Sequence, residues 1–291
     1  MRAEYLLGID GGGTRCRARL IHWQGQLLAE AVGGPANVWS RFDEALATVS
    51  QLARQVFQLA GLPPQALEKT SLVAGLAGAN VASVSARLAS FQLPCQHIRM
   101  LTDVEIACMG AHAGEPGAVF IIGTGSQGAA WDGQRFALLG GWGCALSDSG
   151  SGAELGRRAL RLALLAHEDV VPRTPLTHTL MAHFRHSPET MLLWSLQATP
   201  ADWGSVVPEV FAAASVGDEH GCTLVQQTAD DIALMVRRLT ARSAGRVALM
   251  GGLALPVRPW LAQDVQAMLS EPQGDALDGA LRLARQQAMT V

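Results

Sequence analysis

The stretch Gly8–Thr14, GIDGGGT, combines the groups that a metal-bound phosphate needs. Three consecutive glycines offer backbone N–H groups that no side chain obstructs, and such a concavity binds anions, phosphate above all. Asp10 adds a carboxylate and Thr14 a hydroxyl, which are the oxygen ligands that Mg²⁺ prefers. These residue types at this spacing predict a site for a metal–nucleotide complex. The alternative is a tight hairpin whose glycines serve geometry alone.

The glycine turn lies between two predicted strands, which excludes the two common nucleotide fingerprints. Residues 5–9 are a short apolar run typical of a buried strand, and residues 15–20 alternate polar and apolar side chains as a half-buried strand does. The dinucleotide fingerprint and the P-loop both lead from a strand into a helix, and the P-loop needs a Gly-Lys pair that the chain lacks. The sequence therefore predicts a hairpin whose tip binds phosphate.

The same pattern returns in the second half of the chain. A second Gly/hydroxyl turn, GTGS at 123–126, follows an apolar run, and AWDGQRFAL at 130–138 repeats the Trp, Gly and Gln of HWQGQLLAE at 22–30. LVAGLAGA at 72–79 likewise resembles VALMGGLA at 247–254. Single matches this short arise by chance. Their common order predicts two similar α/β halves that face each other across a cleft, each with a phosphate-binding hairpin.

Turn residues divide the chain into two predicted domains. GEPG at 114–117 separates two apolar segments, so we expect a first domain at 1–116 and a second at 117–291. Residues 151–242 have a mostly helical pattern and form an insertion in the second domain, and the terminal helix at 275–288 has the option of packing back on the first. The other predicted elements are helices at 41–60 (capped by Ser40), 81–90, 104–113 and 258–269, and strands at 71–74, 98–101, 129–132, 136–139 and 246–250.

Composition and charge are those of a compact enzyme. With 291 residues, of which 49% are hydrophobic and 16% charged, the chain is long enough for two domains with sizeable cores. The net charge of −3 and the lack of a long Lys/Arg run exclude a typical nucleic-acid binder, and no apolar stretch approaches the roughly 18 residues of a membrane span. No signal-peptide core precedes the first strand, and the 5 scattered cysteines form no C-x-x-C pair, so we expect a cytoplasmic protein with reduced thiols.

A set of motifs in a fixed order resembles the sugar kinase/heat-shock ATPase/actin superfamily. Within it, the chain resembles the N-acetylglucosamine and glucosamine kinases, which are grouped with the BadF/BadG/BcrA/BcrD-type ATPases. Bacterial glucosamine kinases are most similar in length and over residues 172–211, whereas GGWG at 140–143 is more like the N-acetylglucosamine enzymes. The motifs that carry the resemblance are GIDGGGT, GPANVWS around Asn37, LTDVEIACMGAH, GTGS, GGWGCALSDSGSG, the GD pair at 217–218 and LMGGLA.

The resemblance implies an actin-like (ribonuclease H-like) fold of two similar α/β domains facing a nucleotide cleft, with ATP and Mg²⁺ as cofactors. Asp10 would bind Mg²⁺ through water, and the Gly251-Gly252 turn would let adenosine lie against backbone. The nucleotide-binding positions that the resemblance implies are Asp10, Gly11, Gly12, Gly13, Thr14, Gly123, Thr124, Gly125, Ala213, Gly251 and Gly252.

The reaction that the resemblance implies is direct in-line phosphorylation of the 6-hydroxyl of N-acetylglucosamine or glucosamine. Asp103 matches the family's general base and would accept the proton of that hydroxyl; because it starts a helix, a plain helix cap is the alternative. The positions implied to contact the sugar are Asn37, Asp103, Ser126, Gln127, Trp142, Gly143 and Asp148.

At two positions near the implied sugar site, a role in sugar binding is not fixed by the sequence. Trp142 offers an indole face to an apolar sugar face, but a tryptophan in this context could equally fill the core. Ser149 stands where the family often has Glu or Gln, so any sugar contact made by that longer side chain is changed or lost here.

Two other functions compete with an amino-sugar kinase. The first is an ATPase that activates an iron–sulfur dehydratase or reductase, for which only Cys108 and Cys144 could be cluster ligands. The second is a sugar-sensing regulator, but the related repressors carry a DNA-reading domain before the first strand, which here already begins at Tyr5. We therefore expect a small amino sugar as partner, and no nucleic acid or membrane. The choice of amino sugar stays open, as does the oligomeric state, a homodimer included.

Overall fold

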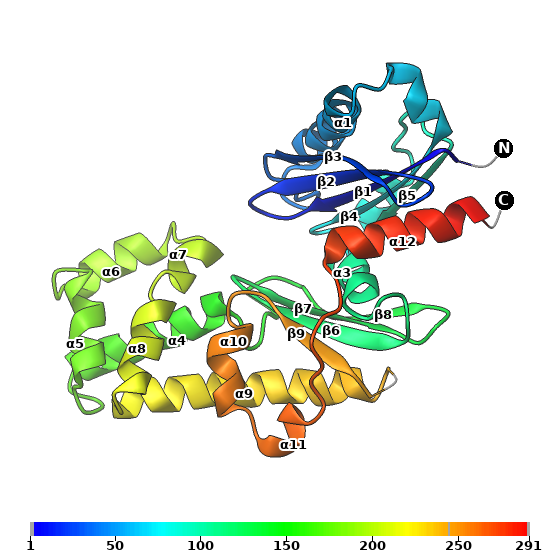
Figure 1. Cartoon of the computed structure of the whole chain (residues 1–291). Helices are drawn as coiled ribbons and strands as arrows, with labels where there is room; N and C mark the ends of the chain where they lie inside the picture. The colour runs from blue at the N-terminus through cyan, green and yellow to red at the C-terminus, as the bar shows by residue number, and fades with distance from the viewer. Residues whose placement is uncertain (1–2, 244, 290–291) are drawn as a thin grey trace.

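The computed structural model describes residues 3–243 and 245–289, and it shows two α/β bodies stacked through two shared helices (Figure 1). The first body is built on a five-stranded sheet with the strand order β3-β2-β1-β4-β5. The second body is built on a four-stranded sheet with the order β8-β7-β6-β9. Within the described ranges, no helix is both long and apolar enough to cross a membrane.

The first sheet is organised around β1, which pairs antiparallel with β2 and parallel with β4. Successive side chains of a strand point to opposite faces. Leu7 and Ile9 therefore join the core under α1 (Phe42–Leu59), whereas Leu6 joins the core under α12 (Ala276–Met289). This explains why residues 5–9 are apolar without alternation. The elements of this body are β1 Tyr5–Gly11, β2 Cys16–His22, β3 Leu27–Gly33, α1 Phe42–Leu59, the 3₁₀ helix η1 Pro64–Lys69, β4 Thr70–Leu76, α2 Ala82–Leu88 and β5 His97–Leu101.

The second sheet repeats the first. β6 pairs antiparallel with β7 and parallel with β9, as β1 does with β2 and β4. The matching Trp-x-Gly-Gln segments fall at equivalent turns, where Gly25 has a φ of +97° and Gly133 a φ of +101°. Because such a backbone favours glycine, the sequence repeat reflects a structural one. The strands are β6 Gly117–Ile122, β7 Ser126–Trp131, β8 Phe136–Gly140 and β9 Val247–Met250.

Two helices, α3 (Asp103–Ala111) and α12 (Ala276–Met289), lie between the two sheets (Figure 1). α12 packs against the first sheet, where the Ser71 hydroxyl donates to the Ala284 carbonyl at 2.8 Å. α3 packs against the first sheet through Ile106 and against the second through Val104. The helices approach closely at Gly110, where a Cβ would overlap the Asp275 carbonyl.

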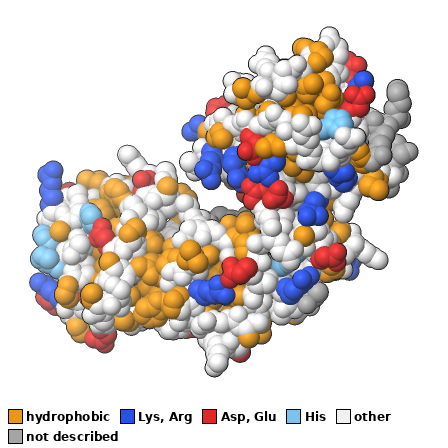
Figure 2. All heavy atoms as spheres, in the orientation of Figure 1, with side chains coloured by type: hydrophobic (Ala, Val, Ile, Leu, Met, Phe, Trp, Pro, Cys, Tyr) orange, Lys and Arg blue, Asp and Glu red, His pale blue; other side chains and the backbone are white. Residues whose placement is uncertain are grey.

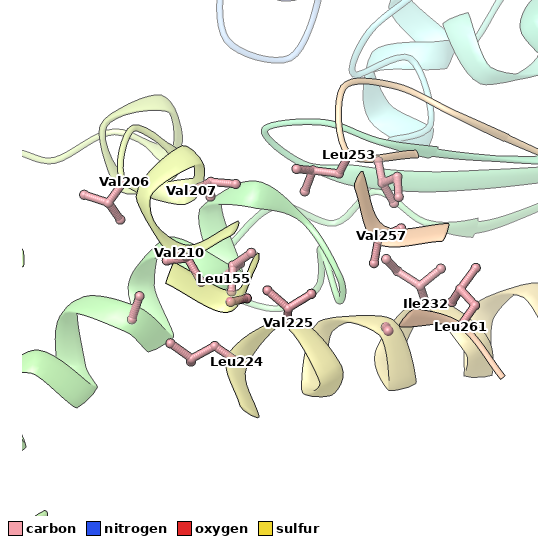
Figure 3. Close-up of a cluster of buried hydrophobic side chains, with 14 of the residues drawn as sticks. Leu155, Val206, Val207, Val210, Leu224, Val225, Ile232, Leu253, Val257 and Leu261 are labelled. Carbon is pink, nitrogen blue, oxygen red and sulfur yellow. The ribbon is translucent and has the colours of Figure 1, made fainter. Parts of the chain in front are cut away.

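The helices between residues 151 and 242 form one lobe beside the second sheet. Its core joins Leu155 of α4, Val210 of α8 and Val225 of α9 (Figure 3). Leu253 and Val257, which follow β9, join the same cluster, so the turn after β9 is anchored to this lobe. The helices of this lobe are α4 Gly152–His167, α5 Pro175–Ala182, α6 Pro188–Ser195, α7 Pro200–Gly204, α8 Val207–Ser215 and α9 Glu219–Thr240. The short helices that follow β9 are α10 Ala254–Val257, the 3₁₀ helix η2 Arg258–Trp260 and α11 Gln263–Gln266.

Ser40 does not cap α1, contrary to the sequence prediction. Arg41 occupies the cap position and makes no side-chain cap. The preceding turn is organised instead by Asn37, whose side-chain oxygen accepts the backbone N–H groups of Trp39 at 3.0 Å and Ser40 at 3.1 Å. Ser40 is therefore part of a turn built by Asn37.

Residues 258–269 do not form the single helix that the sequence predicts. The backbone becomes extended at Leu261, with a ψ of 141°, and this separates η2 from α11. Leu261 is 4% exposed and packs into the core of the helical lobe. Burial of the Leu261 side chain accompanies the interruption of the helix, and an apolar sequence pattern alone does not reveal this interruption.

Candidate active site

A cavity of about 710 Å³ lies between the two bodies and is lined by residues from both. Figure 2 shows the surface hollowed between the upper and the lower body. The walls come from the turns after β1, β4 and β6, the start of α3, and the loop between β8 and α4. The predicted residues that line it are Gly13, Asn37, Asp103, Gly123, Thr124, Gly125, Ser126, Gln127, Trp142, Gly143 and Asp148.

Asp103 is the first residue of α3 and lines this cavity. The helix is capped by Thr102, whose hydroxyl accepts the N–H of Glu105 at 3.2 Å, while the Glu105 carboxylate accepts the N–H of Thr102 at 2.8 Å. The alternative of Asp103 as the helix cap is therefore wrong. One Asp103 oxygen accepts the N–H of Val104 at 3.0 Å, which fixes the carboxylate against the helix.

The surroundings of Asp103 make it a better base than an ordinary aspartate. Burial raises the pKa of Asp103 to about 6, and the negative charge of Asp10 adds to the shift. A carboxylate with this pKa binds a proton more strongly than usual and is still mostly ionised at neutral pH. Position and basicity both suit a group that takes a proton from a substrate hydroxyl.

A second carboxylate, Asp148, is held against the glycine turn of the second body. Asp148 is 7% exposed, has a φ of +63°, and accepts the backbone N–H of Ser126. Burial raises the pKa of Asp148 as well. Gly125 leaves room for this carboxylate, since a Cβ there would lie 3.0 Å from Asp148 Oδ2. Ser149 contributes its carbonyl, which accepts the Ser126 hydroxyl at 2.9 Å, and its side chain does not line the cavity.

Amide side chains of the first body border the same cavity. The Asn37 oxygen is used within its own turn, which leaves the NH₂ end of this side chain to donate to a ligand. Asn80 donates from Nδ2 to the Gly141 carbonyl of the second body at 2.8 Å. Both residues line the cavity, and their hydrogen bond joins the two bodies.

Large apolar side chains are exposed on the cavity wall. Trp142 is 60% exposed and Trp39 is 64% exposed, so the alternative of Trp142 as core filler is wrong. Gln127 packs against Gly141, and its buried side-chain nitrogen has no hydrogen-bond partner in the part of the chain that the structure describes. The indole faces suit the apolar face of a sugar, and the Gln127 amide suits a hydroxyl.

Several glycines of the turns have open space where a side chain would stand. A Cβ on Gly13, Gly123 or Gly252 would meet nothing within 4 Å, and one on Gly12 would meet only the Arg15 carbonyl at 3.4 Å. The protein itself therefore does not demand glycine here, whereas a phosphate lying on the backbone would. These turns fit ATP.

Gly11 differs from its neighbours. A Cβ on Gly11 would lie 2.6 Å from Leu76 Cδ2 and 3.0 Å from the Ala36 Cβ. Packing within the first body is thus sufficient to require glycine at this position. For Gly11, core packing explains the glycine without a phosphate.

The carboxylate of Asp10 stands at the end of β1 and is paired with Arg17, with Nη2 at 2.7 Å and Nε at 3.2 Å from Oδ2. In the described ranges, no three His, Cys, Asp or Glu side chains are grouped as they would be in a metal cage. Mg²⁺ is commonly bound by one or two carboxylates, waters and substrate phosphates, so a single carboxylate beside a phosphate turn fits this ion.

Comparison with known proteins assigns the chain to a family. Residues 7–281 match the BadF/BadG/BcrA/BcrD ATPase family. The chain belongs to that family. It is 38% identical to a glucosamine kinase of Vibrio cholerae over 281 residues, which cover 97% of this chain and 96% of that protein. It is 27% identical to an N-acetylmuramic acid/N-acetylglucosamine kinase of Clostridium acetobutylicum, over 80% of this chain and 78% of that one.

Solved structures share the fold of this protein. A protein of Chromobacterium violaceum, provisionally named an N-acetylglucosamine kinase, superposes with a TM-score of 0.86 at 33% identity, over 97% of this chain and 99% of the other. A hexokinase of the ROK family from Thermus thermophilus shares the fold with a TM-score of 0.59 at 16% identity. The predicted two-part actin-like architecture is confirmed.

Some of the predicted nucleotide-binding positions lie outside the shared cavity. Gly251 adjoins the second glycine turn, because β9 runs parallel to β6 and the Leu253 N–H donates to the Ile122 carbonyl at 3.1 Å. Ala213 instead lines a separate cavity of about 660 Å³ between α5 and α8, which Gly251 does not line. The other predicted positions that do not line the shared cavity are Asp10, Gly11, Gly12, Thr14 and Gly252.

The cysteines give the iron–sulfur alternative little support. Cys108 is 1% exposed, and its thiol lies 3.5 Å from the Gly117 carbonyl. Burial raises the pKa of Cys108 to about 12, which opposes the thiolate that a cluster needs. Cys144 lies in the loop between β8 and α4, whereas Cys108 belongs to α3 and to a buried core cluster.

Sequence reasoning missed Asn80, Trp39 and Arg17. A signal for Asn80 was available, because GAN at 78–80 follows the strand that pairs with β1 and so must end beside the first glycine turn. Trp39 follows Asn37 by two residues and could have been included with it. In the sequence, Arg17 is one of several alternating polar residues of β2. Only its contacts with Asp10 and Asp275 in the structure distinguish it.

Proposed function

We propose that this protein is a kinase that transfers the γ-phosphoryl group of ATP to the 6-hydroxyl of an amino sugar, with glucosamine as its preferred substrate. The observation that carries the proposal is the position of Asp103, which lines one cavity together with the Gly13 and Gly123–Gly125 turns of the two bodies. The named relatives, which are sugar kinases, support the same reaction class.

The geometry would act mainly by positioning, which is what phosphoryl transfer requires. The two glycine turns would hold the phosphates from opposite bodies, and Asp10 would hold hydrated Mg²⁺, which offsets phosphate charge. Asp103 would accept the proton of the sugar hydroxyl and aim its oxygen at the γ-phosphorus. Trp142 and Asn37 would hold the ring, and closure of the bodies would exclude water.

The charge of the cavity supports glucosamine over N-acetylglucosamine. Two carboxylates, Asp103 and Asp148, line the cavity, and among the described residues no Lys or Arg side chain does. The ammonium group of glucosamine would offset this negative charge, whereas the neutral acetamide of N-acetylglucosamine would not. The relative from Vibrio cholerae is named for glucosamine.

We expect kcat/KM for glucosamine to exceed that for N-acetylglucosamine by at least about 10-fold, as removal of a charge-assisted contact commonly costs. ADP release measured over glucosamine, N-acetylglucosamine, N-acetylmuramic acid and glucose tests this. Asp148→Asn should remove most of the preference, because Asn tolerates the left-handed backbone and keeps the contact to Ser126 while losing the charge.

Asp132→Asn is the matched control, since Asp132 lies in the turn between β7 and β8 away from the cavity. Its sugar preference should equal that of the wild type. Equal rates with both amino sugars, or a preference for N-acetylglucosamine, would contradict the assignment of the substrate. A lack of sugar-dependent ADP release would contradict the kinase itself.

A further inference from the structure

We propose that Arg17 is a positioning residue for the end of the site that binds Mg²⁺ and phosphate. Arg17 holds the Asp10 carboxylate and links it to Asp275, immediately before α12. The inference rests on the proposed function, because it assigns Asp10 to a metal–nucleotide complex. It adds a residue that does not contact substrate and acts through Asp10. It also connects the phosphate hairpin to the segment by which the chain returns from the second body.

The first observation is the way Arg17 grips Asp10. The two residues stand directly opposite each other on β1 and β2, so the contact is built into the register of the sheet. Both Nη2, at 2.7 Å, and Nε, at 3.2 Å, donate to Oδ2 of Asp10. Two donors on one oxygen fix the orientation of the carboxylate and leave Oδ1 for a hydrated cation.

The second observation is the third nitrogen of the same guanidinium. Arg17 Nη1 donates to Asp275 Oδ2 at 3.2 Å. Asp275 is itself fixed, because its N–H donates to Asp278 Oδ2 at 2.9 Å and its Oδ1 accepts the N–H of Asp278 at 3.0 Å. The planar fork of an arginine can hold both carboxylates at once, which the point charge of a lysine cannot.

The third observation is where Asp275 lies. Residues 270–275 carry the chain from the second body to α12, and the Gln273 N–H donates to the Ala111 carbonyl at the end of α3. Gly110 lies against the Asp275 carbonyl, so Asp275 is packed closely on α3. Arg17 therefore links the Asp10 carboxylate to the segment that joins the two bodies.

The chain offers a matched control in Arg19. It lies two residues further along β2, and its side chain is 22% exposed compared with 29% for Arg17. Arg19 also reaches the start of α12, with Nη1 at 3.4 Å from Asp275 Oδ1 and 2.6 Å from Asp278 Oδ1. Its remaining partner is Glu30 rather than Asp10. Arg19→Gln removes the same charge from the same strand and leaves the grip on Asp10.

The test compares the full-length wild type with Arg17→Gln, Arg17→Lys and Arg19→Gln. Calorimetry with ADP, with and without Mg²⁺ and in the absence of sugar, measures how much the metal strengthens nucleotide binding. We expect the factor by which Mg²⁺ increases ADP affinity to be at least about 10-fold smaller in Arg17→Gln than in the wild type, the usual effect of losing a hydrogen bond to a charged group. In kinetics, the Mg²⁺ concentration for half-maximal rate should rise while the KM for sugar stays unchanged.

Arg19→Gln should stay within about twofold of the wild type in both measurements, although both arginine variants lose contacts to α12 and should melt at lower temperature. Arg17→Lys should retain the Mg²⁺ defect, because it restores charge without the fork. Full rescue by lysine, or equal Mg²⁺ dependence in Arg17→Gln and Arg19→Gln, would overturn the role of Arg17. A wild type that binds no nucleotide would overturn the proposed function together with this inference.

Discussion

Asp103→Asn is expected to lower kcat by at least about 100-fold, the lower end of what general-base catalysis contributes. The amide cannot accept the proton that leaves the sugar hydroxyl as the phosphoryl group is transferred. ATP affinity should stay close to the wild type, because the glycine turns and Asp10 hold the nucleotide. Steady-state kinetics on the variant, with ATP binding followed by calorimetry, measures both.

The same carboxyl should determine the acid limb of the pH profile. Burial and the nearby charge of Asp10 raise the pKa of Asp103 to about 6, so kcat/KM should rise with pH up to about 6 and level off above it. A raised pKa means that the folded protein binds this proton more tightly than the unfolded chain does, so ionised Asp103 lowers stability at neutral pH. Asp103→Asn removes that charge, and the variant should be at least as stable as the wild type at pH 7.

Glu105→Gln is the matched control for Asp103→Asn. It removes a carboxylate two residues further along the same helix, and a glutamine oxygen can still accept the N–H of Thr102. Its activity should remain within about twofold of the wild type, as expected for a capping contact that the substitution preserves. Near wild-type turnover in Asp103→Asn would remove Asp103 from the mechanism.

Gly12→Val should weaken ATP binding by at least about 100-fold while the protein remains folded. A Cβ at this position meets only the Arg15 carbonyl, at the ordinary contact distance of 3.4 Å, so the first body tolerates it. The branched side chain would occupy the space assigned to the phosphates. Calorimetry with ATP and thermal unfolding of the same variant separate the two effects.

Gly11→Ala gives the opposite pattern and serves as the comparison. Its Cβ would crowd Leu76 and Ala36 in the core, so it should destabilise the protein by about 1–3 kcal/mol, as overpacking does. If Gly12→Val binds ATP normally, the glycines are turn formers and the phosphate site lies elsewhere. If Gly12→Val fails to fold, there is no open space beside Gly12 for a side chain, which contradicts the geometry described above.

Most of the fold could be predicted from local patterns in the sequence. The apolar run of β1 and the alternation of β2 depend only on neighbouring residues, and they predicted the first hairpin and its glycine tip. The match between the two halves predicted equivalent turns, and Gly25 and Gly133 occupy them with the same left-handed backbone. Asp103 was assigned as the base through the family resemblance, because a residue that starts a helix after a strand is equally well explained as a helix cap.

Contacts between distant parts of the chain could not be derived in this way. Asp275 is 258 residues from Arg17, and Asn80 is 61 residues from Gly141, so each pair exists only once the two bodies are placed against each other. The three glycines of GGG are identical in sequence, and only their neighbours in space separate the packing role of Gly11 from the open space at Gly13.

The most direct test of the proposed reaction is the structure of its product. Glucosamine and ATP are incubated with the wild-type protein, and phosphorus–proton correlation NMR locates the new phosphate on the sugar. The proposed reaction predicts coupling of the phosphorus to the two protons on carbon 6, with one ADP formed for each sugar phosphate. Phosphate on the anomeric carbon, or ADP formed without any sugar phosphate, would contradict it.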